Sequence, residues 1–290
     1  MSELVRPSQA NLADRVPPHA FFMVSALFHY LGPSFAVLLF SHVGVLGVAW
    51  LRIASAAAIF AIWRRPWRVV IDCDQGARML IVALGITLAL MNSAFYLAID
   101  RLPLATVAAI EFVATIAVAL VGVRSLRNVA ALVVAVSGVF FLIGFQWSGD
   151  RLGVLLAIAN AALFGVYVVI GHAISRAGGA SGIDRLGAAM LVALIAAMPI
   201  GIAEVVPALS RPELIPAGIG VGVSSSVIPY VCDQLAMARL PRATFALMLT
   251  LLPATAAVVG MVVLAQVPTP AEIAGILLVA RGVGVHKPTQ

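Results

Sequence analysis

The chain has little charge, little cysteine and almost no lysine. Only 10% of its 290 residues are charged, two are cysteines, and Lys287 is the single lysine. A Walker A phosphate loop needs a lysine after its glycines, so the sequence excludes a pump driven by that motif. Two distant cysteines and five scattered histidines form no metal-ligand pattern. Without a GxSxG elbow or a nucleophile-base pair, we expect neither an enzyme nor a bound cofactor.

Apolar residues occupy most of the remaining positions. They make up 62% of the chain, and the mean hydropathy is +1.10. The sequence divides into about ten apolar stretches, each near the ~20 residues that a helix needs to cross ~30 Å of hydrocarbon. No stretch alternates in polarity as barrel strands do, so we predict an all-α integral membrane protein. The expected spans are 20–40, 44–63, 79–99, 103–123, 128–146, 152–175, 185–205, 214–238, 243–265 and 271–286.

The cations predict how the chain lies in the lipid bilayer. With ten spans the links alternate between two sides, and fourteen of the 18 Lys and Arg residues fall on the side of the N-terminus. The other side holds Arg101, Arg151 and Arg211, while Arg52 lies within a span. The positive-inside rule makes the cation-rich side cytoplasmic, with both termini there and residues 1–19 as a short tail. This distribution explains the net charge of +6 without nucleic acid as a partner.

A repeated segment divides the chain into two halves. Residues 97–108 read LAIDRLPLATVA and residues 235–246 read LAMARLPRATFA, with eight of twelve positions identical at an offset of 138. Each half holds five spans, so the second half must enter the membrane inverted. We therefore predict ten transmembrane helices as two inverted five-helix repeats, 20–146 and 151–286. Inverted repeats around a midplane site are typical of secondary transporters, whereas a channel or a membrane enzyme needs no such symmetry.

Two carboxylates within the expected spans are the first candidates for a site, because charge inside a bilayer is costly and usually functional. Glu111 lies eight residues after Pro103 in the fourth span. It is expected to bind substrate or carry a proton, the alternative being a buried structural ion pair. Asp233 follows Pro229 in the eighth span, where a proline can distort the helix. It either lines the site or pairs with an arginine near the cytoplasmic interface.

Other polar side chains within spans are weaker candidates. Arg52 could hold a substrate carboxylate, neutralise Glu111 or extend along its helix, and a structural role is slightly favoured. Asn92 and Tyr96 lie one turn apart and therefore share a face of the third span. A lone His or Tyr in a helix bundle is more often a packing residue than a substrate contact. The remaining candidates of this kind are His29, Tyr30, Tyr167, His172 and Tyr230.

Short motifs spread over residues 20–282 add a resemblance to a known family. They are Ala49-Trp50-Leu51-Arg52, Arg65-Pro66-Trp67-Arg68, Met91-Asn92, Phe95-Tyr96-Leu97, Arg101-Leu102-Pro103-Leu104, Glu111-Phe112, Pro229-Tyr230, Arg239-Leu240-Pro241 and Pro253. On these motifs the chain resembles the EamA branch of the drug/metabolite transporter superfamily, and within it the bacterial threonine/homoserine exporters. The resemblance implies a ten-helix inverted-repeat fold with a central cavity lined by helices 1, 3, 4, 6, 8 and 9.

The resemblance also implies a function and roles for residues. The chain would export small hydrophilic amino acids across the bacterial inner membrane by alternating access. Glu111 would bind the substrate ammonium or a coupling proton. Hydrogen bonds would come from Asn92, Tyr96, Tyr167 and Tyr230.

The chain departs from the family pattern in its second half. Leu252-Pro253 stands where the family often has Glu-Pro, and Ala265-Gln266 where Gly-Glu is common. Thr115 replaces a proline that usually follows the fourth-helix glutamate. The second half has thus lost two acidic groups, which leaves the substrate and proton coupling open. The alternatives are an exporter of other metabolites or drugs on the same fold, and a passive channel or lipid-handling protein.

Overall fold

The computed structural model describes residues 16–120, 126–127, 130, 133–134, 137–138, 150–176, 179–241, 245 and 248–285. In these ranges the regular structure is helical throughout. The elements are α2 (Pro18–Val43), α3 (Val45–Arg64), α4 (Trp67–Asp72), α5 (Gln75–Ile99), α6 (Leu104–Leu120), α8 (Arg151–Ser175), α9 (Gly179–Leu209), α10 (Leu214–Gly222), η1 (Val223–Val227), α11 (Ile228–Met237), η2 (Leu249–Leu251), α13 (Leu252–Leu264) and α14 (Pro270–Val285). Most of the expected fifth span and of the N-terminal tail lies outside the described residues.

Six helical segments are long and apolar enough to cross a membrane. They are α2, α3, α5, α8, most of α9, and the continuous segment Leu214–Met237 that α10, η1 and α11 form together. Three further helices overlap expected spans but are shorter than those six segments: α6 has 17 residues, α13 has 13 and α14 has 16. The prediction of an all-helical membrane protein is therefore confirmed at the level of its class.

The helix boundaries differ from the expected ones at α5, α9 and the link at 64–78, among other places. α5 begins at Gln75 rather than near residue 79, because the side chain of Asp74 caps it by accepting a hydrogen bond from the backbone N of Ala77 at 2.6 Å. α9 extends beyond the expected 185–205 at both ends. The link at 64–78 contains the short helix α4, which hydropathy did not predict because six residues are too few for a span.

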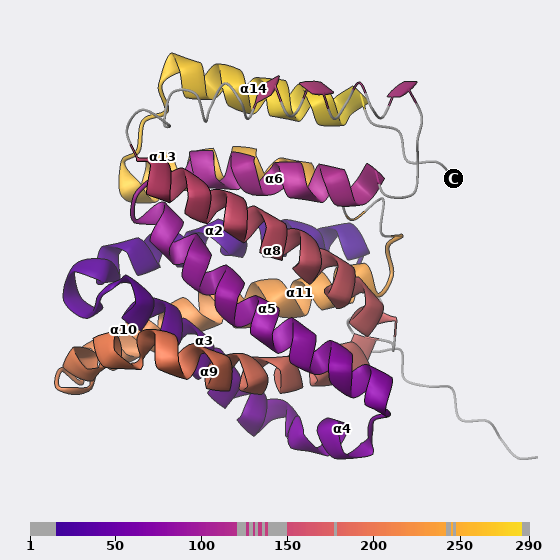
Figure 1. The fold of residues 1–290 in the computed structure, drawn as a ribbon, viewed down its shortest axis with the longest axis vertical. Helices are drawn as coiled ribbons and strands as arrows, with labels where there is room; N and C mark the ends of the chain where they lie inside the picture. The colour runs from indigo at the N-terminus through magenta and orange to yellow at the C-terminus, as the bar shows by residue number, and fades with distance from the viewer. Residues whose placement is uncertain are drawn as a thin grey trace, which may run out of the picture.

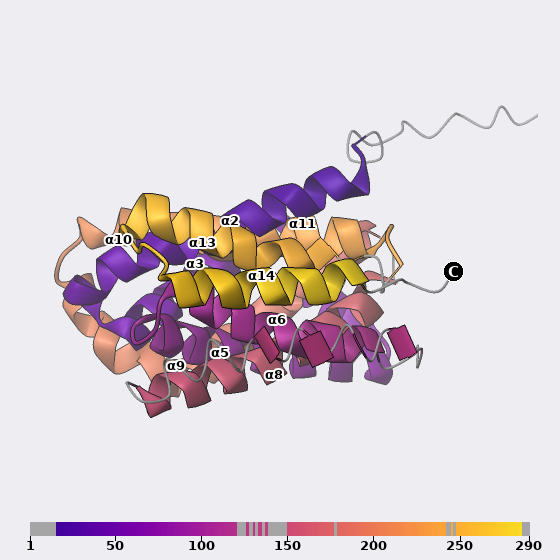
Figure 2. The ribbon, with the colours of Figure 1, turned by 90° about the horizontal axis from the view of Figure 1, so that it is seen from above.

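The helices pack side by side in a bundle (Figure 1), with α14 at one edge against α6 and with α4 and α9 at the opposite edge. α3 packs on α9, and α5 packs on both α8 and α9. On the other side, α2 lies against α11 and α13. In Figure 2 the Pro18 end of α2 and the Val285 end of α14 lie at the same end of the bundle.

α3 and α9 run antiparallel and are joined at both of their ends. Oε2 of Glu204 accepts hydrogen bonds from the backbone N of Leu46 at 2.9 Å and of Gly47 at 3.1 Å. These are N–H groups of the first turn of α3, which have no acceptor within the helix. At the opposite end, Nε of Arg64 donates to Oδ1 of Asp184 at 2.5 Å. Side-chain contacts therefore fix the alignment of these two helices.

The segment between α10 and α11 departs from regular α-helix. Residues 223–227 form a π-helical turn, a feature that often occurs at functional sites. Pro229 follows it and has no N–H to donate to the Ser225 carbonyl, as residue 229 of an α-helix would. A Cβ at Gly32 of α2 would lie only 2.2 Å from Oγ of Ser225 and 2.6 Å from its backbone N. Glycine at position 32 therefore lets α2 approach the irregular turn closely.

Candidate functional site

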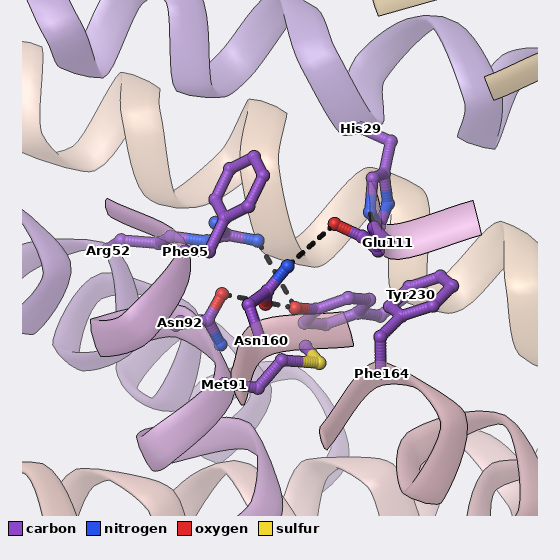
Figure 3. A pocket seen from close by; sticks show the side chains of 9 residues that line it. All are labelled: His29, Arg52, Met91, Asn92, Phe95, Glu111, Asn160, Phe164 and Tyr230. Carbon is purple, nitrogen blue, oxygen red and sulfur yellow. Dashed lines mark hydrogen bonds and ion pairs between the residues drawn. The ribbon is translucent and has the colours of Figure 1, made fainter. Parts of the chain in front are cut away.

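A small cavity lies where α2, α3, α5, α6, α8 and α11 meet. Its free volume is ≈ 10 Å³, which is about the minimum that can hold one water molecule. α3 contributes to it through Arg52, although the family resemblance implied other helices only, and none of the lining residues comes from α13. The cavity (Figure 3) is lined by His29, Arg52, Met91, Asn92, Phe95, Glu111, Asn160, Phe164 and Tyr230.

Glu111 of α6 has one engaged and one uncommitted carboxylate oxygen. Oε2 accepts a hydrogen bond from Nδ2 of Asn160 on α8 at 2.8 Å. Oε1 faces Nε2 of His29 at 3.7 Å and has no hydrogen-bond partner among the described residues. The residue is 2% exposed, and a buried carboxylate oxygen without a partner is costly. A cationic group that entered the cavity would find its strongest interaction here.

Asp233 of α11 is a second buried carboxylate, just outside the residues that line the cavity. Oγ of Ser25 donates to its Oδ1 at 2.5 Å, and the hydroxyl of Tyr167 donates to its Oδ2 at 2.8 Å. His29 lies close enough to interact with it electrostatically. The sequence left pairing with an arginine near the membrane interface open, but in the structure two hydroxyl groups hold this carboxylate.

Arg52 of α3 holds the irregular turn together. Its Nη2 donates to the Ser225 carbonyl at 2.6 Å, in place of the N–H that Pro229 lacks, and its Nε donates to Oγ of Ser226 at 2.8 Å. Nη2 also lies 3.2 Å from the hydroxyl of Tyr230. The side chain is 3% exposed, so it does not extend to the membrane surface. These contacts give Arg52 a structural role of a kind that the sequence did not suggest, and the Arg52 charge also interacts with Glu111.

The polar side chains of α5, α8 and α11 form a connected group beside Arg52. The hydroxyl of Tyr230 donates to Oδ1 of Asn92 at 3.3 Å. The Tyr96 ring lies 5.3 Å from the Arg52 guanidinium carbon, within cation–π distance. The Tyr167 ring lies 5.4 Å from the Tyr230 ring, which connects this group to the Asp233 carboxylate.

The structure thus gathers most of the residues that the sequence singled out. His29, Arg52, Asn92, Glu111 and Tyr230 line the cavity. Tyr96 contacts Arg52, and Tyr167 contacts Tyr230 and hydrogen-bonds to Asp233. The half-buried His172 is not among the lining residues.

Sequence reasoning missed Asn160 and Ser25, which hold the two carboxylates. The criterion that singled out Asn92, a polar side chain in mid-span, would have found Asn160 as well.

Comparison with known proteins adds a family to this geometry. Residues 151–285 match the EamA-like transporter family. The threonine/homoserine exporter RhtA of Salmonella typhimurium (strain SL1344) is 36% identical over 245 residues, which cover 83% of this chain and 81% of that protein. RhtA of Escherichia coli (strain K12) is 35% identical over 245 residues, which again cover 83% of this chain and 81% of that protein.

A solved crystal structure resembles the fold with a TM-score of 0.58 at 17% identity, over 92% of this chain and 96% of the other. At that identity the likeness concerns the fold alone. The relatives, in contrast, cover most of both chains at more than a third identity. The chain therefore belongs to the EamA-like transporter family, together with the RhtA threonine/homoserine exporters.

Proposed function

We propose that this protein is a secondary exporter of small hydrophilic amino acids, threonine and homoserine among them, in the inner membrane of a bacterium. The observation that carries the proposal is the uncommitted Oε1 of the buried Glu111 in a small cavity between the helices, in a chain 36% identical to an exporter of these amino acids. The ammonium group of the substrate would bind Glu111. Asn92 and Tyr230 would offer hydrogen bonds, with Tyr96 and Tyr167 directly behind them.

Alternating access is part of the proposal. With a free volume of ≈ 10 Å³ the cavity is far too small for an amino acid, so helices must move before a substrate can enter. Contacts lie at both ends of the bundle: Nη1 of Arg101 is 3.2 Å from Oδ2 of Asp150, and Nη1 of Arg239 donates to the Val16 carbonyl at 3.0 Å. We propose that opposite sets of such contacts open in turn.

We further propose that the chain consists of two inverted repeats, 20–146 and 151–286. The helix packing supports this, because α5 packs on α8 as α11 packs on α2, and α6 packs on α8 as α13 packs on α2. The corresponding helices α3 and α9 run antiparallel. Asn92 and Tyr230 are 138 residues apart, the offset of the repeat, and hydrogen-bond to each other. Equivalent positions meet in this way only beside a two-fold axis, which would then pass through the site.

The orientation that we propose places both termini in the cytoplasm. The arginine-rich link around α4 lies at the end of the bundle where α2 begins and α14 ends (Figures 1 and 2). That arrangement agrees with the excess of cations counted on this side.

The experiment that tests the function is efflux of labelled threonine and homoserine from preloaded cells. It compares the protein, an empty control, Glu111→Gln and Glu213→Gln at matched membrane levels. Glu213 is exposed and its side chain makes no capping bond at the start of α10, so it provides the matched control. Gln at position 111 can still accept from Asn160 but carries no charge, and we expect it to reduce efflux at least tenfold.

The outcomes separate the alternatives. No efflux above the empty control from a correctly inserted protein would refute the amino-acid assignment and direct the search to other metabolites and drugs. Flux that neither saturates nor shows counterflow would favour a passive channel. Equal efflux by Glu111→Gln and wild type would remove Glu111 from the mechanism.

A further inference from the structure

We propose that His29 carries a coupling proton, and that its imidazolium competes with the ammonium group of the substrate for Oε1 of Glu111. The protein would then exchange one incoming proton for each outgoing amino acid. This inference rests on the proposed export function and adds to it the residue that couples transport to the proton gradient.

The first argument is the geometry of the Glu111 carboxylate. Asn160 occupies Oε2, so Oε1 is the oxygen that remains for a cation, and Nε2 of His29 faces it at 3.7 Å. The imidazole is kept in this direction by ring contacts, with its centroid 5.6 Å from the Phe164 ring and 5.4 Å from the Tyr30 ring. His29 and a substrate ammonium must therefore approach the same oxygen from the same cavity.

The second argument concerns charge. Arg52 is the permanent cation of the cavity, and its guanidinium is engaged with Ser225, Ser226 and Tyr230. The Arg52 charge interacts with Glu111 but its hydrogen bonds go to neutral groups, so Oε1 of the ionised carboxylate is still open to a second cation. Two unit charges about 4 Å apart at an effective dielectric constant of about 20 repel enough to change occupancy on the order of a thousandfold. Imidazolium and substrate ammonium would thus occupy the site alternately, which is the condition for exchange.

The third argument is a second carboxylate, Asp233, with which His29 interacts electrostatically and which can accept the proton. His29 and Ser25 lie one turn apart on the same face of α2, and Ser25 donates to Asp233. When an ammonium group binds Glu111, the imidazolium gives up its proton and Asp233 accepts it. In the proposed orientation Asp233 lies toward the cytoplasm, where it releases the proton. After the substrate leaves on the outer side, a proton from that side returns to His29 and the cycle closes.

Several titratable groups surround His29, and any pH dependence must be assigned among them. They are Glu111 on α6, Asp233 and Tyr230 on α11, Arg52 on α3, Tyr30 on α2 itself, and Tyr167 on α8 behind Phe164.

The test uses the whole protein in proteoliposomes and measures two kinds of threonine transport. Counterflow at equal pH on both sides needs substrate binding and helix movement but no net proton movement. Accumulation driven by a pH gradient, with the membrane potential clamped, needs coupling as well. For a one-to-one exchange, one pH unit supports at most about tenfold accumulation. We expect His29→Gln to lose the accumulation but still to show counterflow above that of empty liposomes. The matched control is His42→Gln, an exposed histidine on the same helix, which should retain both.

Two results with the variant would overturn the inference. Accumulation by His29→Gln equal to that of wild type would show that the proton travels elsewhere. Loss of counterflow together with accumulation would show that His29 binds substrate or supports the fold instead.

A measurement on wild type keeps the inference testable if the variant does not fold. Threonine added to the purified protein in weak buffer should release protons, and no release would refute the competition. If wild type shows no threonine counterflow at all, the proposed function fails, and the inference fails with it.

Discussion

Arg52 and Pro229 should be energetically coupled, because one supplies the donor that the other removes. Nη2 of Arg52 donates to the Ser225 carbonyl at 2.6 Å, and residue 229 has no N–H for that carbonyl. An unsatisfied buried carbonyl costs about 1–3 kcal/mol. Arg52→Met also loses the bonds to Ser226 and Tyr230, although it no longer buries a charge. We expect this change to lower the free energy of unfolding by about 2–4 kcal/mol.

In a Pro229→Ala background the same change should cost less. Residue 229 then carries an N–H, so the Ser225 carbonyl keeps a donor when Arg52 is removed. We expect a coupling free energy of about 1–2 kcal/mol, within the range for residues that share a partner. The assay is reversible unfolding by SDS in mixed micelles, followed by circular dichroism, for wild type, both single variants and the double variant.

The control cycle replaces Arg52→Met with Arg211→Met, at an exposed arginine in the link before α10, and should be additive. If Arg52→Met and Pro229→Ala also add within about 0.5 kcal/mol, Arg52 does not compensate for the proline, and the structural role assigned to it is wrong.

Three further predictions test other parts of the structure. Asn160→Leu removes the donor that holds Oε2 of Glu111, so the half-saturating threonine concentration in efflux should rise about tenfold; an unchanged value would contradict the role of Asn160. Gly32→Ala places a Cβ 2.6 Å from the backbone N of Ser225, and its thermal unfolding temperature should fall clearly below that of wild type. A hydrogen bond from the backbone of the first turn of α8, aided by an arginine, lowers the pKa of Asp150. Its stabilising effect is therefore present above the ordinary pKa of about 4 and lost as the pH falls further, so wild type should lose more stability than Asp150→Asn in acid unfolding titrations.

Most of the membrane-spanning helices could be predicted from the sequence, because the hydropathy and length of an apolar segment can be read from its own residues. The two carboxylates could also be predicted as site candidates, since burying any charge in lipid demands a reason. Glu111 lines the small cavity, and Asp233 lies close to it, within electrostatic reach of His29. The same logic singled out Arg52 but could not choose among its three roles, because that choice depends on which groups lie across from α3.

The remaining features depend on three-dimensional contacts that leave no local pattern. Nothing near Asn160 in the sequence indicates that its partner lies 49 residues earlier. Ser25 and Asp233 are 208 residues apart, and a serine in an apolar helix usually bonds to its own backbone. The π-helical turn at 223–227 could be anticipated only as a distortion near Pro229. Its form depends on the donors that α3 provides.

The double attachment of α3 to α9 has a mechanical consequence. Glu204 fastens one end of the pair and Arg64 with Asp184 fastens the other, so neither helix can slide or rotate against its neighbour without breaking charge-assisted bonds. The two helices should therefore move together as one rigid unit relative to the rest of the bundle. α2 and α11, which hold His29 and Asp233, contact this pair both directly and through the irregular turn that Arg52 secures. If transport proceeds by the proposed movement of helices, the stiffness of that turn would influence how readily α2 and α11 move relative to α3 and α9.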